Sequence, residues 1–123
     1  MPAYGAVASP VALYAGDEVT LWNAESPAAG TSSIAVSLAA HAGSPSPAEL
    51  AISISYGSAP TAQIQVQGAN DDADASYTSG GLPSSANTSP DLLQFSARSQ
   101  FLRVNLVSQS GGGAITVKVR RAA

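Results

Sequence analysis

Cysteine is absent from this 123-residue sequence, and charged residues are scarce. Without cysteine, the chain can form neither a disulfide framework nor a cysteine-ligated zinc site. Asp, Glu, Lys and Arg together make up 11% of the residues, against roughly 25% in an average soluble domain. Five basic and eight acidic residues give a net charge of −3. We therefore expect no nucleic-acid-binding domain, because such domains usually carry a basic surface.

Long apolar runs are also absent, so the sequence predicts no membrane-spanning helix. No stretch approaches the ~18 consecutive apolar residues that such a helix needs. The first five residues contain no basic residue ahead of an apolar run, so we expect no secretory signal peptide. Hydrophobic residues nevertheless make up 45% of the chain. This share, together with the low net charge, is typical of one globular domain and excludes a disordered chain.

Alternation of apolar and polar residues is the strongest pattern present. Its period of two places successive side chains on opposite faces of a strand, and two antiparallel sheets with their apolar faces together would bury all the apolar positions. We therefore predict an all-β fold: an antiparallel two-sheet β-sandwich, jelly-roll-like, with about seven to nine strands and no substantial helix. The sandwich is assigned to 11–123 and an N-terminal arm or extended segment to 1–10. The alternating runs are 34–38, 50–56, 62–66, 102–106 and 115–119, with less regular candidates at 11–14 and 18–22.

Segments rich in glycine, serine and proline separate the alternating runs. The glycine-rich segment 110–113 predicts a hairpin between the last two strands. Residues 73–89 are mostly Ser, Gly, Asn and Thr, which predicts a long surface loop. Residues 89–95 predict one short helical turn that buries Leu92 and Phe95.

A cluster of oxygen-bearing side chains raises the question of a calcium site. The cluster lies between Asn70 and Ser76, and its four members have the i, i+2, i+4, i+6 spacing with which a calcium loop presents its ligands. The helical calcium loop also needs Gly at its sixth position and Glu at its twelfth, where this chain has Ala75 and Gly81. The calcium signal is therefore weak, and a solvated turn is the main alternative, because Asn and Asp bond their own backbone. We predict no cofactor. The candidate ligands are Asn70, Asp72, Asp74 and Ser76.

Nothing in the sequence favours an enzyme. His41 is the only histidine, and a catalytic triad would need it beside an activated serine and an orienting acid. The chain has no Gly-x-Ser-x-Gly elbow. No spacing brings two carboxylates together as a glycosidase requires. We therefore expect a protein without catalytic activity.

Charge is sorted by sign along the chain: all eight acidic residues precede position 92 and all five basic residues follow position 97. A hairpin of the last two strands would bring Arg103 beside Lys118, with Arg120 on the same polar face. Like charges opposite one another are mildly destabilising, and a negatively charged partner would offset that cost. These residues are therefore interface candidates, although a solvated face with splayed side chains is the alternative. The partner would be a different protein or another copy's turn at Asp71, Asp72 and Asp74.

One aromatic residue breaks the alternation. Trp22 falls out of phase with Val19 and Leu21, so we expect its ring to face outward. An outward ring contacts another subunit, or it offers a flat surface on which a sugar stacks. In the second case Tyr77 is the other candidate ring beside a groove.

Two parts of the chain are similar to a known group of proteins. The segment 62–71, an alternating strand and then a small-Asn-Asp turn, resembles a motif of many tailed-phage virion proteins. The ending, 101–106, a glycine-rich turn and then 115–119, resembles the closing hairpin of the same group. In that group an aromatic residue follows the turn, and Tyr77 stands in for it, somewhat later along the chain. The likeness covers roughly residues 60–120, about half of the chain.

This resemblance implies a structural β-sandwich protein of a phage particle, a capsid decoration or cement protein. Such a protein binds the assembled shell at the capsid surface, stabilises it, and contacts the major capsid protein or other virion subunits. The group commonly forms trimers, so the resemblance also implies a homo-oligomer with a trimer favoured. Carbohydrate-binding β-sandwiches share the same motifs. The alternative is therefore a carbohydrate-binding module of a phage tail or fibre, or of a secreted protein.

Overall fold

The computed structural model describes residues 10–26, 28–38, 47–56, 61–71, 73–87, 90–110 and 114–123. Over these residues the chain forms nine strands and one three-residue 3₁₀ helix, which confirms the all-β prediction. No helix in this part of the chain is long and apolar enough to cross a membrane. The elements are β1 (Val11–Ala12), β2 (Glu18–Glu25), β3 (Val36–Ser37), β4 (Ala48–Tyr56), β5 (Thr61–Ala69), η1 (Asp74–Ser76), β6 (Ser84–Asn87), β7 (Asp91–Ala97), β8 (Phe101–Ser110) and β9 (Ile115–Arg121).

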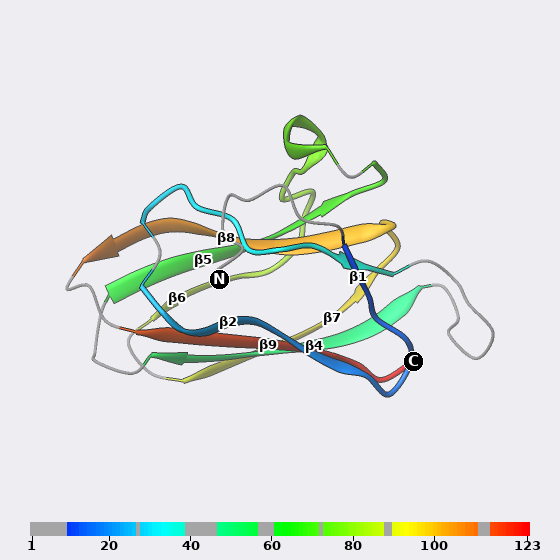
Figure 1. The fold of residues 1–123 in the computed structure, drawn as a ribbon, viewed down its shortest axis with the longest axis horizontal. Coiled ribbons are helices and arrows are strands. Elements are labelled where there is room, and N and C mark those ends of the chain that lie inside the picture. The colour runs from blue at the N-terminus through cyan, green and yellow to red at the C-terminus, as the bar shows by residue number, and fades with distance from the viewer. Residues whose placement is uncertain are drawn as a thin grey trace.

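The strands form two sheets that face each other (Figure 1). One sheet has the order β1-β3-β8-β5-β6 and the other has the order β2-β9-β4-β7. All pairs of these strands are antiparallel except β1 with β3. The pairing is nested, because β2 lies beside β9, β3 beside β8, β4 beside β7 and β5 beside β6. Nested pairing of eight strands in two sheets is the jelly roll. The predicted β-sandwich is therefore confirmed.

The core lies between the two sheets and follows from the alternation of the sequence. Every second residue of β4 from Ala48 to Tyr56 is buried, and the same holds for β9 from Ile115 to Arg121. The two strands are neighbours, so their inward side chains form one apolar surface against the other sheet. Burying an aliphatic side chain of this kind stabilises a fold by about 1.5–3 kcal/mol.

β8 and β9 do not form the predicted hairpin. β8 pairs with β3 and β5, whereas β9 pairs with β2 and β4 in the other sheet. The prediction was wrong because alternation tells which face a side chain takes and not which strand lies next to it. Residues 111–113 between the two strands lie outside the described residues.

The segment predicted as a long surface loop contains regular structure. It includes η1, an isolated antiparallel bridge between Thr78 and Gly68, and strand β6, which pairs with β5. Figure 1 shows the green part of this segment standing above the five-stranded sheet. β6 has the sequence SSAN, without a large apolar side chain, so alternation of hydrophobicity could not reveal it.

Residues 91–97 form strand β7, not a helical turn. β7 pairs with β4 along its whole length. A helical turn would have buried Leu92 and Phe95 together, but in the strand they lie on opposite faces. Leu92 is 55% exposed, and Phe95 is half-buried. Pairing with β4 satisfies backbone groups along seven residues, whereas a single helical turn fixes several residues for one hydrogen bond.

Three features of the sequence analysis fall outside the described residues. The N-terminal arm at 1–10 does so except for Pro10, which directly precedes β1. His41 and Asp72 also lie outside them.

Candidate functional site

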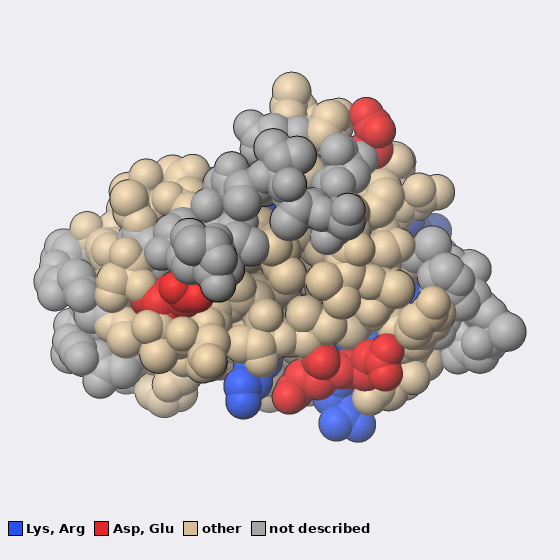
Figure 2. Space-filling model, in the orientation of Figure 1, with Lys and Arg blue, Asp and Glu red and all other residues tan. Residues whose placement is uncertain are grey.

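The outward face of the four-stranded sheet carries two basic and two acidic residues among mostly small side chains. Lys118 pairs in register with Ser53 of β4, and Arg120 pairs with Ala51; both basic side chains are exposed. Figure 2 shows blue and red side chains lying side by side at the lower edge of the view, over this sheet. The charges of this face are therefore mixed, with Glu18 opposite Arg120 in register. The other outward residues are Glu18, Thr20, Glu49, Ser55, Leu92, Gln94, Ser96 and Thr116.

A shallow groove of about 390 Å³ crosses this face between β4, β9 and the start of β7. Lys118 and Asp91 are its two charged residues, and the rest of the described lining is largely hydroxyl-bearing. The oxygens of Asp91 already accept hydrogen bonds, Oδ2 from the Ser85 hydroxyl at 2.7 Å and Oδ1 from the Leu92 N–H at 2.9 Å. The ammonium of Lys118 is exposed. Lys118 therefore offers its ammonium group to an acceptor of a partner at this groove.

Arg103 does not share a face with Lys118 and Arg120. It projects from β8 in the five-stranded sheet, and its guanidinium carbon lies 4.0 Å from the centre of the Tyr77 ring. Its Nε donates a hydrogen bond to Oε1 of Gln67 at 2.9 Å. The prediction of one basic face made by all three residues was wrong because it rested on the hairpin. Arg103 instead holds the Tyr77 segment against its own sheet through a cation–π contact.

Tyr77 belongs to a second, small apolar cluster outside the main core. It packs with Ala35 and Ala69, and all three are buried. The backbone of the next residue, Thr78, exchanges two hydrogen bonds with Gly68, at 2.9 and 3.1 Å, which fixes the segment beside β5. The Tyr77 ring is only 8% exposed, so it offers little surface on which a sugar could stack.

Trp22 points into the core, contrary to the prediction of an outward ring. It is 1% exposed, and its neighbour Leu21 is buried as well. The register of β2 against β9 shifts between Thr20 and Trp22, where β2 holds an extra residue. Such a bulge disrupts the strict alternation of inward and outward residues. Alternation counted from Val19 therefore predicted the wrong face for Trp22. Trp22 therefore contributes to stability and presents no ring to a partner.

The acidic turn after β5 is described in part. Asp71 is exposed, and Asp74 begins η1. Oδ1 of Asn70 accepts a hydrogen bond from the backbone N–H of Gln100 at 3.3 Å, so this oxygen fastens the turn to the residues just before β8. Among the described residues, no three His, Asp or Glu side chains gather in a way that could hold a metal ion.

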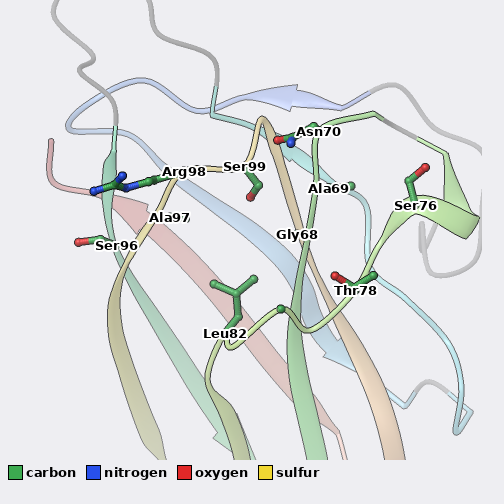
Figure 3. Close-up of a pocket in the computed structure, with 11 residues that line it drawn as sticks. Gly68, Ala69, Asn70, Ser76, Thr78, Leu82, Ser96, Ala97, Arg98 and Ser99 are labelled. Carbon is green, nitrogen blue, oxygen red and sulfur yellow. The ribbon is translucent and has the colours of Figure 1, made fainter.

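A cavity of about 410 Å³ opens beside this turn, at one end of the sandwich (Figure 3). Figure 3 shows the end of β5 in the middle, Ser76 and Thr78 on one side of it, and Leu82 and the turn between β7 and β8 on the other. Asn70 and Ser76, two of the calcium candidates, contribute to the lining. Arg98 lines the rim and points away from Leu82 and Thr78 in this view. The described lining holds no aromatic ring and consists mainly of small and hydroxyl-bearing residues.

The sequence analysis missed a buried arginine. Arg121 is 0% exposed; its Nη1 donates to the carbonyl of Leu13 at 2.8 Å and its Nε to the main-chain oxygen of Ala123 at 3.1 Å. It continues the inward alternation of Val117 and Val119, and this phase is the signal that identifies it. The guanidinium joins the segment after β1 to the end of β9.

Comparison with known proteins gives one informative result at the level of the fold. No family model and no curated protein matches the sequence. Among solved structures, the fold is similar to that of the SPBc2 prophage-derived protein YomS, with a TM-score of 0.55 and 18% sequence identity. The similarity covers 87% of this chain and 94% of that chain. The two proteins therefore share a fold over nearly their whole lengths.

Proposed function

We propose that this protein is a structural component of a phage particle, a capsid decoration or cement protein that binds the assembled shell as an oligomer and stabilises it. The observation that carries the proposal is the fold shared with a prophage-derived protein over nearly the full length of both chains. The virion-like strand and turn at 62–71 point in the same direction. In this role the protein performs no catalysis and acts by binding alone.

The outward face of the four-stranded sheet suits contact with a large partner. Its small side chains, such as Ala51 and Ser53, have little rotamer freedom to lose on binding, so burying them costs little entropy. Lys118 and Arg120 lie among them together with Glu18 and Glu49, and such mixed charges fix the orientation of a partner more than they raise affinity. We therefore assign the shell-facing contact to this face.

Stabilisation of the shell follows from selective binding. A protein that binds the assembled lattice and not its separate subunits shifts the equilibrium toward the lattice by linkage. An oligomer contacts several lattice positions at once, so weak individual contacts combine through effective concentration.

The test uses phage particles from the bacterial strain that carries the gene. Particles are purified from its lysate, and the chain is sought by mass spectrometry and located by immunogold electron microscopy. We expect gold on the heads, heads that open at lower temperature when the gene is deleted, and recovery when purified protein is added back. Absence of the chain from the particles, or gold on the tails alone, contradicts the proposal.

A further inference from the structure

The four edges of the two sheets differ in their protection against pairing with another strand. β1 has two residues and β6 has four. β2 has two register shifts against β9 and carries glutamates at both ends. Short length, bulges and charges are the devices by which proteins block edge pairing. β7 lacks them: it has seven residues, its one charge is Asp91 at the first position, and it pairs with β4 without a register shift.

Alternate main-chain groups of β7 point toward this edge. The backbone N–H of Leu92 donates to Oδ1 of Asp91 at 2.9 Å and not to β4. In an antiparallel pair, every second residue bonds to the neighbouring strand and the residues between them direct their groups the other way. The N–H and C=O groups of Leu92, Gln94 and Ser96 therefore face the edge of the sheet.

The apolar side chains on the inner face of β7 are also incompletely covered. Leu93 and Phe95 are half-buried, whereas their partners in register on β4, Ile52 and Leu50, are 0% and 4% exposed. β7 is the last strand of its sheet, so no further strand of the described chain flanks these two residues. One more strand at this edge would complete their burial.

We propose that β7 of one copy pairs antiparallel with β7 of a second copy about a two-fold axis at Gln94, which joins two four-stranded sheets into one. In this register Gln94 lies opposite the partner's Gln94, and Leu92 lies opposite the partner's Ser96. All these residues direct their main-chain groups to the edge, so the Gln94 pair exchanges two hydrogen bonds. Each Leu92–Ser96 pair does the same once the Leu92 N–H leaves Oδ1 of Asp91. Inner faces also match, because Leu93 lies opposite the partner's Phe95.

The self-complementary register and the placement of charge on β7 favour a second copy as the occupant. Asp91 is the only charged residue of the strand, and in this register it lies opposite the partner's Ala97. The two carboxylates therefore lie at opposite ends of the joined strands, where they do not repel each other. A ring of three copies joined by strands would need two open edges on each copy, whereas the other three edges are blunted. The geometry thus predicts a two-fold dimer in place of the trimer that the resemblance implies.

The first test compares two substitutions at the axis by light scattering after size exclusion. Gln94→Pro removes an N–H that faces the edge and keeps every hydrogen bond to β4, so we expect it to be a monomer. Gln94→Thr changes the side chain and keeps the N–H, so we expect it to be a dimer like the natural protein. A natural protein that is a monomer or a trimer, or a Gln94→Pro variant that stays a dimer, overturns the proposal.

The second test keeps the proposal open to refutation if the proline variant does not fold. Leu92→Lys combined with Ser96→Lys places like charges opposite each other in the dimer, on side chains that are exposed in the monomer. We expect self-association to weaken roughly tenfold in this variant and in the Glu/Glu variant. The Glu/Glu variant should also lose some stability as a monomer, because Ser96→Glu places a carboxylate opposite Glu49 of β4. Mixing the Lys/Lys and Glu/Glu variants should restore a dimer. If mixing restores nothing, the register is wrong.

This inference deepens the oligomer part of the proposed function. The role of the dimer rests on that proposed function. The two fail separately. A dimer that does not bind phage heads leaves the β7 pairing intact and contradicts the shell-binding role. A natural protein that binds heads as a monomer leaves that role intact and overturns the pairing.

Discussion

The hydroxyl of Tyr56 on β4 lies 3.1 Å from the hydroxyl of Ser85 on β6, so a hydrogen bond joins the two sheets of the sandwich. Ser85 donates its own hydrogen to Oδ2 of Asp91 at 2.7 Å. A serine hydroxyl has one hydrogen to donate, so Tyr56 is the donor to Ser85. This chain of hydrogen bonds links β4, β6 and β7, and it ends on the strand to which we assign dimer formation.

The Tyr56 hydroxyl makes stability depend on alkaline pH. Burial raises the pKa of Tyr56 above its ordinary 10.0, and the Asp91 carboxylate raises it further. Because the folded pKa exceeds the unfolded one, this contribution to stability is complete below the unfolded pKa and is lost as pH rises through the folded pKa. We expect the free energy of unfolding from urea titrations to fall more steeply above about pH 10 than in Tyr56→Phe.

The same variant tests the hydrogen bond at neutral pH. Tyr56→Phe should cost about 1 kcal/mol, because the buried Ser85 hydroxyl loses its donor. Tyr14→Phe is the matched control, since it removes a hydroxyl from a ring that is 43% exposed. If both variants lose the same stability and the same alkaline dependence, the bond between the sheets contributes nothing of its own.

Gly68 allows β5 to approach the turn between β7 and β8. A Cβ at this position would lie 2.6 Å from Oγ of Ser99 and 3.2 Å from Cδ1 of Leu82. Gly68→Ala should therefore destabilise the protein by about 1–3 kcal/mol, because the short Ser99 side chain has little room to move. Denaturant unfolding measures the loss.

A double-mutant cycle separates this clash from other effects of Gly68→Ala. Ser99→Ala removes the hydroxyl that the new methyl group would meet, so Gly68→Ala should cost less in the Ser99→Ala background. An equal cost in both backgrounds shows that contact with the Ser99 hydroxyl is not the cause.

The sequence predicted the faces of strands far better than their neighbours. Alternation placed Ile52 and Val104 inward because a side chain in a strand has only two directions to take. It could not reveal that β8 and β9 belong to different sheets, since both pairings bury the same residues. The sequence analysis therefore predicted that Arg103 and Lys118 are neighbours, although the structure places them on different sheets.

The remaining errors have local causes. The Trp22 prediction failed at a bulge, which adds one residue to β2 without a signal in the pattern of hydrophobicity. Arg121 was identifiable, because it keeps the inward phase of Val117 and Val119. Its charge suggested a solvated residue, and only a structure shows the carbonyl of Leu13 that makes its burial possible.

Arg121 should therefore be far less replaceable than its neighbour Arg120. Arg121→Met removes donors to the carbonyl of Leu13 and the main-chain oxygen of Ala123, so we expect a loss of about 1.5–3 kcal/mol. Arg120→Met removes the same charge from an exposed position and should change stability by less than about 0.5 kcal/mol. Denaturant unfolding of both variants decides the matter, and equal losses would contradict the anchoring role.

The proposed shell-facing contact predicts charge-dependent binding to phage heads. Lys118→Glu combined with Arg120→Glu places two negative charges at the centre of the outward face, so binding to heads that lack the protein should weaken about tenfold or more. The natural protein should also bind more weakly as salt is raised, because exposed charges are screened over roughly 10 Å at 0.1 M salt. Co-sedimentation with purified heads measures both effects.

Arg98→Glu provides the control for net charge. Arg98 is exposed beside the cavity at the end of the sandwich, away from the outward face of the four-stranded sheet. Reversing it changes the overall charge without changing the proposed contact, so binding should stay within about twofold of the natural protein. The double variant should also keep its oligomeric state, since neither substituted residue belongs to β7. If Arg98→Glu weakens binding as much as the double variant does, the attraction is a general effect of net charge and the contact lies elsewhere.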